Sequence, residues 1–207
     1  MIMKKQIISI ILTFFIATAA FAGQPDKQSP EAAMALLQQS MEDVLEVLED
    51  PDLTIEEQQQ RIEAIVDPVV NYDLIARLSL GPRNWPRLDS QQRRMFVERF
   101  VNRLKDSYFQ NIALIEGDTE TRISYGELRE DNNRVHIPVR AGMQDASVDM
   151  VYKFHLSEDR GWQVYDVEVN GVSIVASFRS QFSQILADHS VEELLERLKT
   201  LEAPPVE

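Results

Sequence analysis

The chain has 207 residues, no cysteine and a formal net charge of −13. This acidity disfavours binding to nucleic acid and adsorption to anionic lipid surfaces. The absence of cysteine excludes disulfides, so the fold must be stabilised by burial of apolar side chains.

The N-terminus has the layout of a secretory signal. Lys4 and Lys5 precede an apolar run at residues 7–20, and Ala20 and Ala22 supply small residues where a signal peptidase cuts. The alternative is a membrane anchor, but the run is shorter than the ~20 residues that a spanning helix needs. We therefore predict residues 1–22 as a cleaved signal peptide. Losing its two lysines takes the net charge from −13 to −15.

Residues 23–207 are predicted to form one domain, which begins with a helical part at 29–115. Ser29 and Pro30 are typical of a helix start, and apolar residues then recur at helical spacing to residue 49. Thr54 and Glu57 form a capping-box pattern that opens a second helix. A short third helix ends at Leu80, and a long fourth helix is predicted at 89–115.

The apolar period then changes from helical spacing to two, over residues 120–170. Strands are predicted at 121–125, 134–140, 148–156 and 162–169, with a turn at Asn132 and Asn133. Apolar residues alternate with polar ones in the middle strands, which predicts an antiparallel meander with one apolar face. Two closing helices follow at 173–202. The order of helices, meander and helices predicts an α+β fold with about four strands.

No catalytic or metal-binding motif is visible in the sequence. The three histidines, His136, His155 and His189, have no ligand-type neighbours at zinc spacing. Ser173 lacks the second glycine of a nucleophile elbow, and no glycine-rich phosphate loop occurs. The remaining catalytic candidate is Asp166, as a cavity acid. We predict that the protein is not an enzyme and uses no cofactor or metal.

One segment is basic within this acidic chain. Residues 83–105 contain seven basic and two acidic side chains, whereas residues 23–82 contain three basic and thirteen acidic ones. The basic segment is either the solvated face of a helix or a docking patch for a partner or lipid headgroup. The candidate docking residues are Arg83, Arg87, Arg93 and Arg94.

Several stretches resemble the MlaC-type family of periplasmic phospholipid-binding proteins, also called toluene-tolerance ABC-transport auxiliary proteins. Residues 162–175, WQVYDVEVNGVSIV, and residues 178–182, FRSQF, resemble the family signature. Residues 72–81, YDLIARLSLG, with Trp85 and residues 92–96, are similar to the helical region of that family. The resemblance extends from about residue 30 to residue 200.

The resemblance implies a curved antiparallel sheet packed with N- and C-terminal helices around an apolar cavity. It implies a carrier that exchanges phospholipid between an outer-membrane lipoprotein complex and an inner-membrane ABC transporter with an MCE-domain subunit, contributing to lipid asymmetry of the outer membrane. The candidate cavity residues are Tyr108, Val139, Met150, Tyr152, Phe154, Ile174 and Phe178, and the alternative for each of them is a place in the ordinary core. Two other functions remain open: a periplasmic chaperone for apolar segments, and a small-molecule enzyme on the same fold.

Overall fold

The computed structural model describes residues 26–113, 122–143 and 146–200. The helices are α1 (Pro30–Glu49), α2 (Ile55–Val66), α3 (Tyr72–Asn84), the 3-10 helix η1 (Trp85–Arg87), α4 (Ser90–Ala113), α5 (Ile174–Asp188) and α6 (Val191–Arg197). The strands are β1 (Arg122–Tyr125), β2 (Arg129–Asp131), β3 (Arg134–Met143), β4 (Ala146–Ser157), β5 (Gly161–Val169) and β6 (Val172–Ser173). Among these residues, no helix has the length and apolar character that crossing a bilayer requires.

Side-chain caps fix the helix starts that the sequence predicts. The Ser29 hydroxyl accepts a hydrogen bond from the Ala32 amide, and Thr54 and Glu57 form the reciprocal capping box of α2. Gly81 has a φ of 81°, which is unfavourable for other residues, and it interrupts the helical backbone of α3 at the predicted end. The segment nevertheless continues as helix to Asn84.

The sheet is antiparallel in the order β1-β3-β4-β5-β6, with β2 pairing to β3. The α+β prediction is confirmed, but the sheet has six strands where about four were predicted. The two additional strands, β2 and β6, have three and two residues. Such strands are too short for alternation to reveal them.

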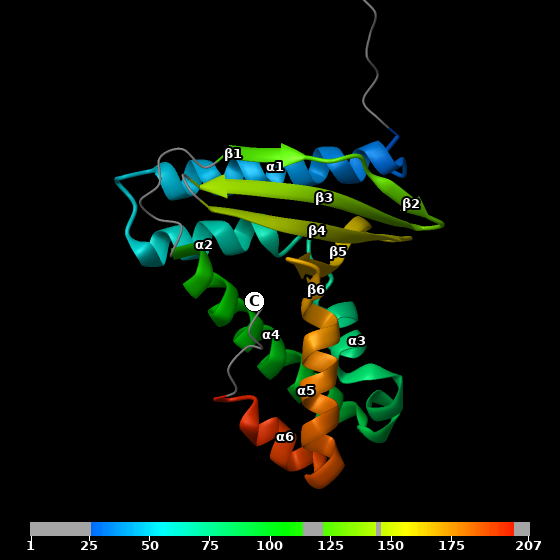
Figure 1. Cartoon of the computed structure of the whole chain (residues 1–207). Helices are drawn as coiled ribbons and strands as arrows, with labels where there is room; N and C mark the ends of the chain where they lie inside the picture. The colour runs from blue at the N-terminus through cyan, green and yellow to red at the C-terminus, as the bar shows by residue number, and fades with distance from the viewer. Residues whose placement is uncertain (1–25, 114–121, 144–145, 201–207) are drawn as a thin grey trace, which may run out of the picture.

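The molecule has an upper part, in which α1 lies along the sheet, and a lower part made of helices α3 to α6 (Figure 1). Each part has its own group of buried apolar residues. The sheet cluster contains Ala33, Leu37, Val135, Ile137, Val139, Phe154, Trp162 and Val164. The helical cluster contains Ile75, Ala76, Leu80, Leu88, Phe96, Phe100, Val175, Phe178, Phe182, Leu186, Val191, Leu194, Leu195 and Leu198.

Strand β5 connects the two parts through polar contacts. The Val164 amide donates to the Val69 carbonyl (2.8 Å), and the Asn71 amide donates to the Val164 carbonyl (2.9 Å). These bonds fix the start of α3 against β5. Further along β5, the buried carboxylate of Asp166 accepts hydrogen bonds from the Val175 amide (3.1 Å) at the start of α5. Thus β5 sets the position of both α3 and α5.

Candidate functional site

One face of the sheet carries the apolar side chains of β3 and β4. The register pairs Val135 with Phe154, Ile137 with Tyr152 and Val139 with Met150, so these side chains lie on the same face. Helix α1 covers this face, with Ala33 and Leu37 buried in the sheet cluster. The alternation predicted from the sequence therefore produces a continuous apolar surface beneath α1.

Burial varies along this face. At the first turn of α1, the Trp162 indole donates to the Ser29 carbonyl (2.9 Å). Phe154 is fully buried, whereas Tyr152 and Met150, on the same face of β4, are partly buried. These two side chains are therefore the more accessible part of the apolar face.

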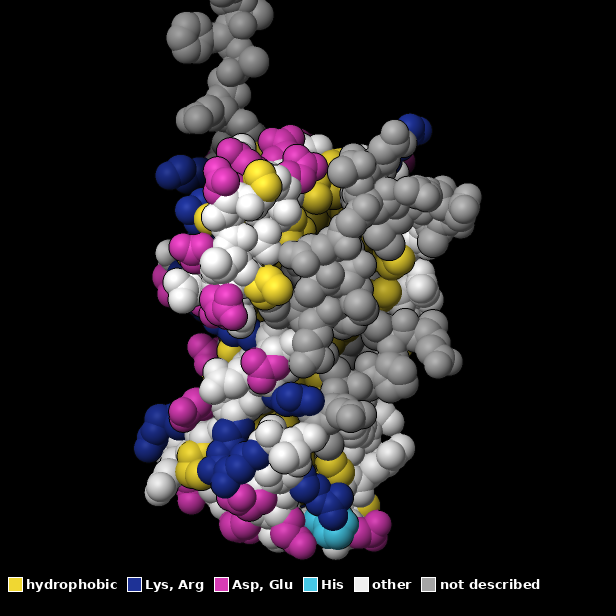
Figure 2. All heavy atoms as spheres, turned by 90° about the vertical axis from the view of Figure 1, so that its left-hand side faces the viewer, with side chains coloured by type: hydrophobic (Ala, Val, Ile, Leu, Met, Phe, Trp, Pro, Cys, Tyr) yellow, Lys and Arg dark blue, Asp and Glu magenta, His cyan; other side chains and the backbone are white. Residues whose placement is uncertain are grey.

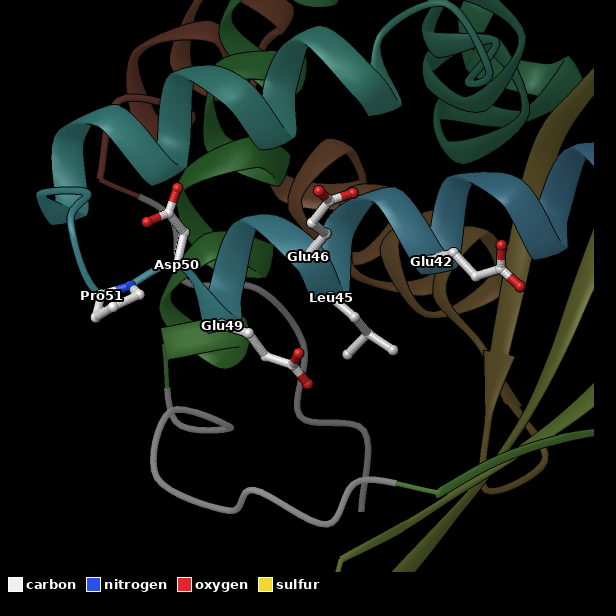
Figure 3. Close-up of a pocket in the computed structure, with 6 residues that line it drawn as sticks. All are labelled: Glu42, Leu45, Glu46, Glu49, Asp50 and Pro51. Carbon is white, nitrogen blue, oxygen red and sulfur yellow. The ribbon is translucent and has the colours of Figure 1, made fainter.

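A shallow hollow lies at the C-terminal end of α1. It is lined by Glu42, Leu45, Glu46, Glu49, Asp50 and Pro51, which come from the last two turns of α1 and the following loop. In Figure 3, Leu45 and Glu49 project from the side of α1 away from α2, whereas Glu46 and Asp50 point toward α2.

The hollow combines carboxylates with apolar surface. Figure 2 shows hydrophobic side chains in a recess of the upper part, with acidic side chains along its edge. Burial raises the pKa of Tyr125 on β1, and the charge of Glu42 raises it further, which places this carboxylate near the sheet. Asp50 forms a long ion pair with Arg61 of α2 (3.8 Å). The hollow therefore presents four carboxylates beside the apolar side chains of Leu45 and Pro51.

The opposite face of the sheet carries a polar network centred on Lys153. The Lys153 ammonium contacts the carboxylates of Asp166 (3.0 Å) and Glu168 (2.5 Å). Burial alone lowers the pKa of Lys153, but the hydrogen bonds to these carboxylates outweigh it and raise the pKa. Burial lowers the pKa of His136, and so does the nearby Lys153 charge. Within the described ranges, no group of three or more metal-ligating side chains occurs.

The MlaC protein family matches residues 38–200 of the chain, which is most of its length. The chain belongs to the MlaC family. A solved structure of similar fold is the phospholipid-binding protein from Ralstonia solanacearum in complex with a phospholipid. The two chains are 22% identical with a TM-score of 0.71, over 80% of this chain and 94% of the other. The match confirms the family resemblance of the sequence, and the common fold is an α+β sandwich with an open sheet.

Four of the seven predicted lipid-binding residues lie together on the MlaC fold. Val139, Met150, Tyr152 and Phe154 share the apolar face of the sheet. The backbone of Tyr108 lies in α4, but its side chain is outside the described part of the structure.

The other two, Ile174 and Phe178, lie in the helical cluster. Phe178 is 2% exposed and packs edge-on against Phe100, with ring centroids 4.9 Å apart.

The four predicted docking arginines surround the connection between α3 and α4. Arg83, Arg87 and Arg94 are exposed. Arg93 is partly buried: its guanidinium lies 5.5 Å from the centre of the Trp85 ring and donates to the Trp85 carbonyl (3.3 Å). Three of the four are thus accessible to a partner, and Arg93 stabilises the loop.

The sequence analysis missed the acidic lining of the hollow. Glu42, Glu46 and Glu49 recur at spacings of four and three residues, which places them on neighbouring faces of one helix. That spacing was visible in the sequence. The sequence does not show which element these carboxylates face, because helical periodicity does not identify the packing partner of a helix.

Proposed function

We propose that this protein is a periplasmic phospholipid carrier. The observation that carries the proposal is the MlaC family match over residues 38–200, on a fold shared with a protein solved in complex with a phospholipid. The apolar sheet face, on which Tyr152 and Met150 are partly buried, supports it. In this proposal the acyl chains contact Met150 and Tyr152, while the buried Val139 and Phe154 form the wall behind them.

A carrier solves an energetic problem of lipid transfer. A two-tailed phospholipid has roughly 30 methylenes, and each costs ~0.8 kcal/mol on moving from an apolar phase to water, or about 24 kcal/mol in total. A cavity as apolar as the bilayer removes most of this barrier. The bound and membrane states then have similar free energies, so the direction of transfer must come from a coupled energy source.

The family resemblance suggests where the carrier exchanges its lipid. We propose that it is exported by a cleavable signal peptide and shuttles phospholipid between an outer-membrane lipoprotein complex and an inner-membrane ABC transporter with an MCE-domain subunit. This role would contribute to the lipid asymmetry of the outer membrane and to toluene tolerance. The carrier itself performs no chemistry in this proposal, consistent with the structural, polar network around Asp166.

The function can be tested by native mass spectrometry of the purified protein. We expect a bound mass equal to that of a two-tailed phospholipid. Met150→Trp should reduce the bound fraction at least severalfold, because the larger ring fills the accessible part of the apolar face. Val151→Trp is the matched control, since the neighbouring side chain points to the opposite face.

A labelling experiment covers the case in which these tryptophan variants do not fold. The chain has no cysteine, so Met150→Cys and Val151→Cys each introduce a unique site for a polarity-sensitive fluorophore. Added phospholipid should shift the emission of the first and leave the second unchanged. Equal responses at both positions would place the lipid elsewhere. Release of lysophospholipid or free fatty acid with time would show an enzyme instead.

A further inference from the structure

The seven basic residues of the segment 83–105 fall into two structural groups. Four are engaged with other parts of the molecule. Arg99 donates to the Leu195 carbonyl (2.6 Å), Lys105 pairs with Asp67 (2.7 Å) and Arg103 lies 3.9 Å from Asp106. The fourth, Arg93, contacts Trp85. Arg93, Arg99 and Lys105 thus connect α4 to other segments, whereas the pair of Arg103 with Asp106 lies within α4.

The other three, Arg83, Arg87 and Arg94, are exposed and have no ion-pair partner among the described residues. We call them the basic surface. Among the described residues, the only side-chain hydrogen bond of these three arginines is donated by Arg87 to the neutral amide oxygen of Asn84 (3.2 Å). The acid nearest in sequence to Arg83 and Arg87 is Asp89, which accepts the Gln91 and Gln92 amides (both 2.8 Å) as the cap of α4. Its carboxylate is therefore committed to the helix.

The backbone beneath the basic surface is held firmly. Leu88 is 2% exposed, the Trp85 ring packs edge-on against Phe96, and Arg93 lies over Trp85. The α3–α4 connection lies in the lower, helical part, away from the sheet (Figure 1). The hollow is built from α1 and its following loop. The two surfaces thus come from different elements.

We propose that the basic surface docks onto an acidic protein surface at the membrane where lipid is exchanged. Guanidinium groups bind carboxylates in a bidentate manner. Arg83 lies in the last turn of α3, Arg87 in η1 and Arg94 in the first turns of α4, so three guanidinium groups without an ion-pair partner flank one fixed connection. The alternative, an anionic bilayer, is disfavoured because the only exposed large hydrophobic residue of the described structure is Ile55, in α2. The basic surface therefore lacks an apolar anchor for insertion. The proposal deepens the carrier function and rests on it.

The test uses the full protein, carrying fluorescent phospholipid, with native inner- and outer-membrane vesicles. The acceptors for comparison are protein-free vesicles made of the same extracted lipids. R83E/R87E/R94E should transfer lipid to one class of native vesicle roughly tenfold more slowly than the wild type at low salt, because complementary charges set the encounter rate. High salt should shrink the difference. The neutral variant R83Q/R87Q/R94Q should be intermediate.

The matched control is R129E/R160E, which reverses two exposed arginines of the sheet half. It should transfer at the wild-type rate. Bound lipid, measured by native mass spectrometry, should be the same in all variants. Equal transfer rates in the triple variant and the wild type would overturn the proposal. An equal loss of transfer rate on protein-free vesicles would also overturn it and would identify a membrane surface as the occupant. Loss of self-association of the triple variant in sedimentation would overturn it as well and would identify a second copy of the chain.

Cosedimentation with the native vesicles separates docking from lipid carriage. If no lipid is bound but the triple variant still cosediments less than the control, the carrier function fails and the docking surface stands. If lipid is bound and cosedimentation is unchanged, the docking surface fails and the carrier function stands.

Discussion

At the scale of single residues, Asp166 has the most demanding position. Its side chain is 6% exposed and accepts hydrogen bonds from the Ser173 hydroxyl (2.7 Å), the Val175 amide (3.1 Å) and Lys153 (3.0 Å). It therefore binds β4, β6 and α5 at once. The sequence singled it out as a possible cavity acid, but the structure places it in a saturated network between strands and helix.

We predict that Asp166→Ala lowers the free energy of unfolding by about 3 kcal/mol, because it removes one of the two carboxylates at the Lys153 ammonium and leaves the Val175 amide, in the first turn of α5, without its acceptor. Urea denaturation monitored by circular dichroism measures this loss. The control is Asp149→Ala, which removes the solvent-exposed pair with Arg140 and should change stability little. Similar losses in both variants would mean that burial does not set the strength of the Asp166 network.

At the scale of elements, the helical cluster and the sheet cluster differ in how tightly their side chains pack. Phe96, Phe100, Phe178 and Phe182 pack with ring centroids 4.9 to 5.7 Å apart. This geometry is favourable for aromatic rings and leaves no room for a ligand between them. The partly buried Tyr152 and Met150 belong to the sheet cluster instead.

Phe178→Ala should therefore lower the stability of the delipidated protein by about 3–5 kcal/mol, from lost burial and a residual cavity. The lipid content of the folded protein should remain that of the wild type, in contrast to Met150→Trp. Thermal unfolding and native mass spectrometry measure the two effects. Loss of lipid without loss of stability would instead support the sequence-based assignment of Phe178 to the cavity.

Much of this architecture could be predicted from local patterns. The capping residues Ser29, Thr54 and Ser190 mark helix starts that the structure contains. Alternation assigned Val139 and Met150 to one face. The same patterns could not separate the two clusters, because a helical stripe shows that a face is buried but not against what. For this reason Phe178 was predicted beside Phe154, although they lie in different clusters.

The docking arginines show the same limit. Charge along the chain identified the basic segment and its four docking candidates, but it did not show which of the seven basic residues form contacts within the molecule. The structure separates them by tertiary contacts such as Arg99 with Leu195, which are distant in sequence and carry no local pattern. The contact of Arg93 with Trp85 depends on how the α3–α4 connection folds, and the sequence does not show it. Arg93 was therefore predicted as a docking residue together with its exposed neighbours.

At the scale of the whole molecule, export can be tested at the N-terminus, which lies outside the described residues. We predict that the mature chain begins at Gly23 and is released by osmotic shock. Ala22→Leu should block cleavage, because the peptidase requires a small residue there, whereas Ala19→Leu should be processed normally. Intact-mass analysis reads both results. A wild-type chain that keeps residues 1–22 and remains with the membrane would contradict the export hypothesis.

The order of strands has a consequence for aggregation. The long strands β3 and β4 are internal, and β1 and β2, which pair with the outer side of β3, have four and three residues. On the other side, β5 pairs with the two-residue β6, and Val164 of β5 forms backbone bonds with Val69 and Asn71. Long free edges are what allow sheets of different molecules to join. The described sheet therefore combines a partly accessible apolar face with edges that offer little template for intermolecular pairing.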